Sequence, residues 1–299
     1  MKDRVPRFKR NPKAVGGIVI QERDVEIISL VYEYRFLNSD QLQSLIGCSH
    51  QVALRRLQKL FHHGYLDRPV SQVIFSNPLL GQQKMVYGLG DKGADILAEM
   101  RGIEKGNAAW NEKNRETRER YIQHTLMISQ FRTCLTLALR DTNNAKLLFW
   151  MRENVNKLKD HAYEEESGKK RRLPVVPDGY FGVEDVEGKM YFFFEADRST
   201  MSNARFLAKL RAYWLWWQQG RTKRRFGIDN FRVLTITTSK QRRDNLARTA
   251  RQANKAGAGA YMFWFAAADD IKLDDPNTTL QNIWITANTG DGKFHSLLE

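Results

Sequence analysis

Three carboxylates stand at the ends of two strand-like segments in the second half of the chain. Asp178 lies within Pro177-Asp178-Gly179, and Glu195 and Asp197 close the run that begins Tyr191-Phe192-Phe193-Phe194. If the two segments are strands of one sheet, these acids meet at its rim. Carboxylate oxygens suit Mg²⁺ or Mn²⁺, and a carboxylate-bound cation can assist hydrolysis of a phosphodiester. The sequence therefore predicts a metal site made of Asp178, Glu195 and Asp197, although Pro-Asp-Gly is also a common turn.

The elements that must position these acids follow from hydrophobic periodicity and turn residues. They are a long helix over 118–140, strands near 147–150, 175–183 and 189–197, a helix over 202–219, a strand over 231–237, a helix over 239–255 and a strand over 261–265. The charged segments 161–172 and 221–225 are predicted as loops. The order αβββαβαβ predicts an α/β or α+β domain with a mixed sheet.

The first hundred residues have a different pattern, with helices predicted from Arg23, from Asp40 to Ile46 and from Ser49 up to Gly64. The second has an N-cap at Asn38 or Ser39 and ends at Gly47, and the third ends at Gly64. Two strands follow, at 65–69 and 84–89, joined by a loop through Asn77-Pro78, and then a helix over 91–100. This order resembles a winged helix-turn-helix domain.

The predicted organisation has four parts. They are a basic arm over 1–20, mobile until it meets an acidic partner, a winged helix-turn-helix domain over 21–103, a linker over 104–117 and the α/β domain with a mixed sheet over 118–299. The DNA-contacting residues are predicted on the basic face of the third helix and in the basic loops: Gln51, Arg55, Arg56, Lys59, Lys84, Lys170, Arg171, Arg172, Arg224 and Arg225.

The second domain resembles the PD-(D/E)XK nuclease superfamily. That resemblance implies that Asp178 and Glu195 are the two metal-binding acids. A lysine two residues after the second acid is also implied, but Asp197 stands there. Either Lys209, from the following helix, or Arg198 can replace its charge, and Lys209 is the one placed in the predicted catalytic set.

The whole pattern is similar to the replication-relaxation family of bacterial plasmids and other mobile elements. The similarity rests on the winged helix, the Pro-Asp pair, the motif Glu195-Ala196-Asp197-Arg198-Ser199-Thr200, and Lys209 with Tyr213. It covers roughly residues 20 to 265. It implies DNA binding or DNA processing in the replication, relaxation or transfer of such an element.

Composition supports a polyanionic partner. The chain of 299 residues has 48 Lys and Arg against 34 Asp and Glu, a formal charge of +14, and a pI near 9.8. Cys48 and Cys134 have neither disulfide-framework nor zinc-site spacing, which fits a reducing cytoplasm. The basic N-terminus lacks the apolar core of a signal peptide, and no apolar stretch approaches the length of a membrane span, so no membrane partner is expected.

Two functions from different classes remain open. The chain is either a divergent metal-dependent DNA endonuclease or a transcriptional or copy-number regulator with a degenerate nuclease-like domain. An RNA-processing nuclease is a third interpretation. Expected partners are double-stranded DNA, other replication or transfer proteins and a second copy in a homodimer, since the aromatic segment 213–217 suits a core or subunit contact more than base stacking.

Overall fold

The computed structural model describes residues 7–75, 84–102, 114, 117–152, 158–166, 168–253, 260–287 and 293–299. The chain divides into two compact units, Met1–Gln130 and Phe131–Glu299. The division falls inside one long helix, and the expected domain boundary at residue 118 precedes it. Most of the expected linker over 104–117 and the loop around Asn77-Pro78 lie outside the described residues. The fold is mixed α+β, as the sequence predicts.

The first unit contains helices and one small sheet. Its elements are a 3-10 turn Pro12–Val15, α1 Glu22–Tyr34, β1 Leu37–Asn38, α2 Ser39–Ile46, α3 His50–His63, β2 Leu66–Asp67, a 3-10 turn Val70–Phe75, β3 Val86–Leu89 and α4 Asp91–Arg101. The sheet has the order β1-β3-β2, and both pairings are antiparallel. The first turns of the long helix α6 (Glu119–Asp141) also belong to this unit, where Ser129 Oγ donates to the Phe36 carbonyl at 2.7 Å.

Capping residues set the ends of α2 and α3. The Asn38 side chain accepts hydrogen bonds from the backbone N–H groups of Asp40 and Gln41 at 3.0 and 2.9 Å. Gly47 and Gly64 end the two helices with φ of 69° and 89°, a left-handed conformation in which glycine avoids the strain of a side chain. The predicted start of α2 and both predicted helix ends are confirmed.

The second unit is built on a six-stranded mixed sheet of order β11-β10-β9-β8-β7-β4. Its elements after α6 are β4 Ala145–Arg152, β5 Asp160–Glu166, β6 Lys169–Val175, β7 Gly179–Asp185, β8 Lys189–Asp197, α7 Asn203–Gln218, α8 Arg221–Phe226, β9 Arg232–Thr237, α9 Lys240–Ala250, β10 Phe263–Ala267 and β11 Ile285–Thr286. Strands β8, β9 and β10 are parallel, and the other pairings in this sheet are antiparallel.

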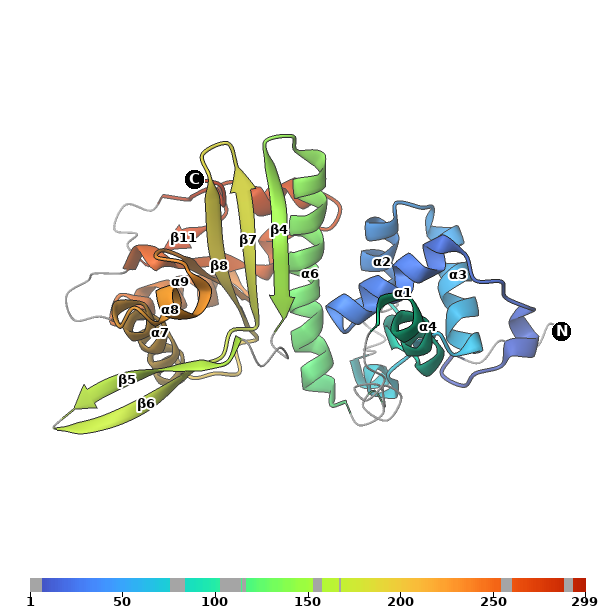
Figure 1. Ribbon diagram of the computed structural model, residues 1–299, viewed down its shortest axis with the longest axis horizontal. Coiled ribbons are helices and arrows are strands. Elements are labelled where there is room, and N and C mark those ends of the chain that lie inside the picture. Colours follow the sequence, from blue (N-terminus) through green and yellow to red (C-terminus); the bar gives the residue numbers. More distant parts are fainter. Residues whose placement is uncertain are drawn as a thin grey trace. The chain divides into compact units, whose positions relative to one another are not determined.

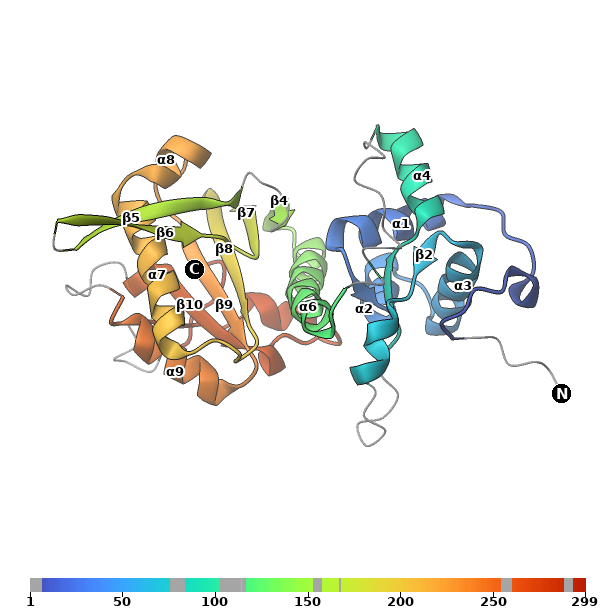
Figure 2. The same cartoon turned by 90° about the horizontal axis from the view of Figure 1, so that it is seen from below.

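Helices cover both faces of the sheet (Figure 2). On one face Phe131 of α6 stacks on Phe194 of β8, with ring centroids 4.5 Å apart. On the other face Phe193 meets Tyr213 and Trp216 of α7. Because side chains alternate along a strand, the acids at the end of β8 share the Phe193 face and point toward the α7 side.

A two-stranded hairpin, β5 with β6, extends away from the sheet (Figure 1). The prediction of a loop over 161–172 is therefore wrong. The segment appears loop-like because it is highly charged, but the pairing sets Glu164 opposite Arg171 and Glu165 opposite Lys170. Opposite charges facing each other across a strand pair stabilise it, so this charged segment can form a ribbon.

Two further expectations differ from the structure. The predicted strand over 175–183 is two strands, because β6 ends at Val175 and β7 begins at Gly179, with Pro177 between them. The predicted basic loop over 221–225 is the short helix α8, which lies between left-handed Gly220 and Gly227. Within the described residues, no helix combines the length and apolar character needed to cross a membrane.

Candidate acidic site and nucleic-acid surfaces

Asp178 and Glu195 are cross-strand neighbours. The antiparallel register pairs Gly179 with Phe194, so one residue further Asp178 lies opposite Glu195. Asp178 extends the pairing through its N–H, which donates to the Phe194 carbonyl at 3.0 Å, and its Oδ2 accepts from the Ala196 N–H at 2.8 Å. Like charges in facing positions repel, so this pair needs a compensating charge.

Lys209 and Tyr213 of α7 supply that compensation. Lys209 Nζ forms an ion pair with Glu195 Oε2, and the Tyr213 hydroxyl donates to Glu195 Oε1 at 2.6 Å. The two residues are one helical turn apart and therefore reach the same acid. The contact between Lys209 and Glu195 is the one expected from sequence, and its catalytic role stays a prediction.

Burial dominates the ionisation of Glu195. The side chain is 3% exposed, and desolvation raises its pKa to about 7, against the opposing influence of Lys209. The negative charge of Asp178 raises the pKa further. Near neutral pH this acid is thus poised between its charged and neutral forms.

Asp197 has different partners, which come from β9 and α9 and not from α7. Arg242 of α9 donates from Nε to Asp197 Oδ2 at 2.9 Å and from Nη2 to Oδ1 at 3.4 Å. The Thr237 hydroxyl, from the neighbouring position of β9, also donates to Oδ2 at 2.9 Å. Asp197 is therefore held in a nearly buried ion pair, and the sequence did not single out Arg242 as its partner.

These acids can be tested as ligands for the divalent cation that the nuclease resemblance implies. Among the described residues, no group of three or more His, Cys, Asp or Glu side chains is arranged to hold a metal ion. Both oxygens of Glu195 and both of Asp197 accept hydrogen bonds from protein donors. As arranged, the residues do not fit such a cation, because Lys209 and Arg242 supply the positive charge in its place. Metal binding by Asp178, Glu195 and Asp197 stays a prediction.

The two halves of α3 differ in how far their side chains are exposed. At its N-terminal half Gln51 and Arg55 are exposed, as a DNA-contacting role requires. Arg56 is different, because its guanidinium binds both carboxylate oxygens of Asp24, a fully buried residue of α1. Arg56 therefore ties α3 to α1, and its contact with DNA stays a prediction.

The described part of the N-terminal arm lies along the C-terminal half of α3. Backbone carbonyls of Gly17 and Gly16 accept from Lys59 Nζ at 3.2 Å and from His63 Nε2 at 2.8 Å. The Asn11 N–H donates to His62 Nδ1 at 3.0 Å, and His62 is 1% exposed although it lies off the apolar stripe. The arm was expected to be mobile without an acidic partner, but here backbone carbonyls serve as the acceptors for the basic residues of α3.

The other predicted DNA contacts lie on several elements. Lys84 forms an ion pair with Asp40 at 3.0 Å. On β6, the residues Lys170, Arg171 and Arg172 are exposed, and Lys170 lies 4.3 Å from the centroid of the Tyr163 ring.

On α8, Arg224 donates to the Gln219 carbonyl at 2.9 Å, and Arg225 lies 3.9 Å from Asp160. Asp160 was missed from sequence, although it also accepts from Arg221 and Trp216, each at 2.8 Å. It therefore anchors α8 and the end of α7 to the hairpin.

The protein is thus of a two-unit class. One unit is mainly helical and exposes the N-terminal half of a basic helix, and the other is an α/β unit with a buried acidic pair beside a lysine. Comparison with family models identifies the family. The replication-relaxation model matches residues 28–230, which is more than half of the chain, and the chain belongs to this family. The family suggests a role in the replication or relaxation of a plasmid or other mobile element. No curated protein and no solved structure matches the chain.

Proposed function

We propose that the chain is a duplex DNA-binding protein that acts in the replication, relaxation or transfer of a plasmid or other mobile element. The observation that carries the proposal is the arrangement of the first unit. Helix, strand, two helices and two strands follow in order, with the sheet order β1-β3-β2. This is the arrangement expected of a winged helix-turn-helix domain, in which α3 is the helix that enters the major groove.

The exposure of α3 supports the same proposal. Recognition helices use their N-terminal residues to contact base edges. Here the arm covers the C-terminal half of α3 and leaves Gln51 and Arg55 exposed at the other half. The net charge of +14 favours the phosphate contacts that give most of the affinity.

The first prediction tests base recognition. Arg55→Ala is expected to lower discrimination between sequences by about 1 to 3 kcal/mol, because a bidentate contact to a base edge is lost. Selection from a pool of randomised duplexes, followed by competition gel shifts, measures it. Replacing Lys169 to Arg172 with serine serves as the contrast, since weaker phosphate contacts should lower affinity evenly across sequences. Unchanged selectivity in Arg55→Ala would remove α3 from this role.

In the second unit we propose a nuclease-like domain that contributes DNA contact and dimerisation, with its acids neutralised by Lys209 and Arg242. The rival function is a divergent Mg²⁺- or Mn²⁺-dependent endonuclease. One observation favours the rival: Asp178 faces Glu195, and the hydroxyl of Thr235, in register with Glu195 on β9, is buried with no partner among the described residues. Such an orphaned hydroxyl suits a site that holds something further.

Cleavage of DNA separates the two functions. Supercoiled, linear and branched DNA are incubated with the intact protein and either metal, beside Asp178→Ala. The expected result is that every DNA form stays uncut, because Lys209 and Arg242 occupy the acids. Metal-dependent nicking that Asp178→Ala abolishes, with DNA binding retained, would establish the endonuclease instead.

A further inference from the structure

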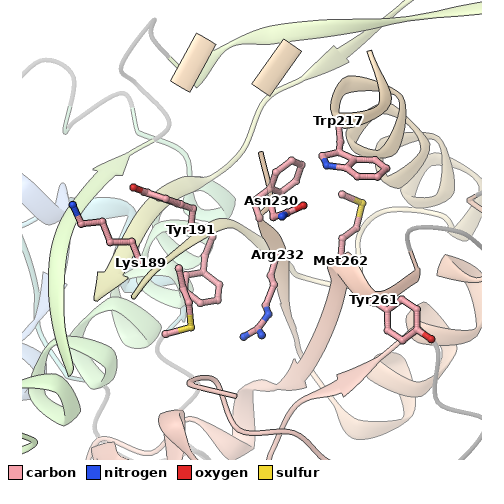
Figure 3. Close-up of a pocket in the computed structure, with 10 residues that line it drawn as sticks. Lys189, Tyr191, Trp217, Asn230, Arg232, Tyr261 and Met262 are labelled. Carbon is pink, nitrogen blue, oxygen red and sulfur yellow. The ribbon is translucent and has the colours of Figure 1, made fainter. Parts of the chain in front are cut away.

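One residue of the aromatic segment 213–217 is not part of the core. Tyr213 and Trp216 are fully buried, as a core role predicts, but Trp217 is 37% exposed. It lines a pocket of about 440 Å³ where β8 and β9 begin (Figure 3). A pocket of this size is in the range that holds small ligands. Burial in the core therefore does not account for Trp217.

The pocket gathers aromatic surface that faces solvent. Three aromatic residues are exposed within the described part of the chain, namely Trp217, Tyr261 and Phe294, and two of them line this pocket. Trp217 is held in place by its Nε1, which donates to the Asp229 carbonyl at 2.9 Å. An ordered, exposed ring offers a face on which a planar group can stack without further loss of side-chain freedom.

The polar residues of the pocket complement a nucleotide. Lys189 and Arg232 bring positive charge, and none of the described lining residues is acidic. The Arg232 guanidinium donates to the Leu297 and Glu299 carbonyls, so Lys189 is the cation expected to meet a phosphate. The Lys189 side chain is 56% exposed, and its Nζ lies 3.9 Å from Glu184 Oε1, a long and exposed ion pair for which a phosphate can compete. Asn230 is exposed beside Trp217, and a carboxamide can both donate to and accept from the edge of a base.

We infer that this pocket binds an unpaired nucleobase of single-stranded DNA, stacked on Trp217 and Tyr261 with its phosphate near Lys189. Aromatic platforms beside basic side chains bind single strands in this way, with little dependence on sequence. A base inside a duplex cannot enter, because it is paired and stacked on its neighbours. The inference goes beyond the proposed duplex recognition by the first unit.

Stacking predicts a preference that charge alone does not produce. The intact protein is titrated into a fluorescein-labelled oligothymidine strand and into an abasic strand of the same length, and anisotropy is recorded. The wild type should bind the oligothymidine strand more tightly. Trp217→Ala and Tyr261→Ala should each weaken that binding at least about fivefold and reduce the preference over the abasic strand, because a base loses its stacking partner.

Two controls keep the result specific. Phe294→Ala removes an exposed aromatic residue outside the pocket and should leave both affinities unchanged. Duplex affinity should be unchanged in all three variants. If the wild type itself does not recognise duplex DNA, the proposed function is overturned and this inference still stands. The inference would be overturned if the wild type bound the abasic strand as tightly as the oligothymidine strand. It would also be overturned if the Trp217 and Tyr261 variants lost duplex affinity in parallel, or if the wild type bound oligouridine RNA more tightly than oligothymidine.

Discussion

Arg56→Ala is expected to destabilise the first unit by about 3 to 5 kcal/mol, because it leaves the carboxylate of Asp24 buried without its cation. Asp24 is 0% exposed, and its other described partner is the Gln21 N–H at 2.7 Å. The hydrogen bond to Asp24 also raises the pKa of Arg56, so the guanidinium stays charged at any ordinary pH. Hydrogen exchange of the α1 and α3 amides measures the loss locally.

Arg55→Ala is the matched control, since Arg55 is adjacent on the same helix but exposed. Its effect on stability should stay within about 0.5 kcal/mol. The double variant with Asp24→Ala should cost less than the sum of the two single variants, because removing both partners leaves no unpaired charge. A stable Arg56→Ala protein with lost DNA selectivity would show instead that Arg56 reads bases.

Local signals predicted much of the first unit. Asn38, Gly47 and Gly64 define helix ends through contacts within a few residues, so the bounds of α2 and the end of α3 follow from the sequence. The role of Arg56 does not follow, because its partner is 32 residues away on α1. Helical periodicity shows only that Arg56 lies off the apolar stripe, a position equally suited to DNA or to a neighbouring helix.

The second unit shows the same limit at its acids. The strand pattern correctly placed Glu195 and Asp197 at the end of β8, and the following helix placed Lys209 within reach. Which cation each acid binds depends on the order of strands in the sheet. Because β9 lies beside β8, α9 brings Arg242 to Asp197, and a sequence without contacts between distant segments does not show this.

The pH dependence of the second unit is expected to carry the signature of Glu195. Burial raises its pKa from an ordinary 4.5 to about 7 in the folded protein. Between pH 4.5 and pH 7 the folded state therefore keeps a proton that the unfolded chain has lost. Raising the pH through this window therefore favours unfolding. The resulting loss is about 3 kcal/mol relative to Glu195→Gln, which cannot titrate, and it is complete above about pH 7.

Urea unfolding followed by tryptophan fluorescence reports on this unit, because six of the seven tryptophans belong to it: Trp150, Trp214, Trp216, Trp217, Trp264 and Trp284. The measured quantity is the difference in unfolding free energy between wild type and Glu195→Gln from pH 5 to pH 8. Other groups, such as Asp160, whose pKa is lowered mainly by its hydrogen bonds to Arg221 and Trp216 against the effect of burial, titrate in both proteins and cancel. A difference that does not vary with pH would exclude a buried, protonated Glu195.

Lys209→Met separates the charge of the ion pair from the packing of its side chain. At pH 8 wild-type Glu195 is mostly ionised beside Lys209, whereas the variant has to hold it protonated, so the substitution should cost about 1 kcal/mol more at pH 8 than at pH 5. At pH 5 Glu195 is protonated in the folded state of both proteins, so the cost there reports the packing of the Lys209 side chain. Lys209 opposes the raised pKa, and its removal should therefore move the window of lost stability to higher pH. An equal cost at both pH values would mean that Lys209 contributes through packing, and that Glu195 does not depend on its charge.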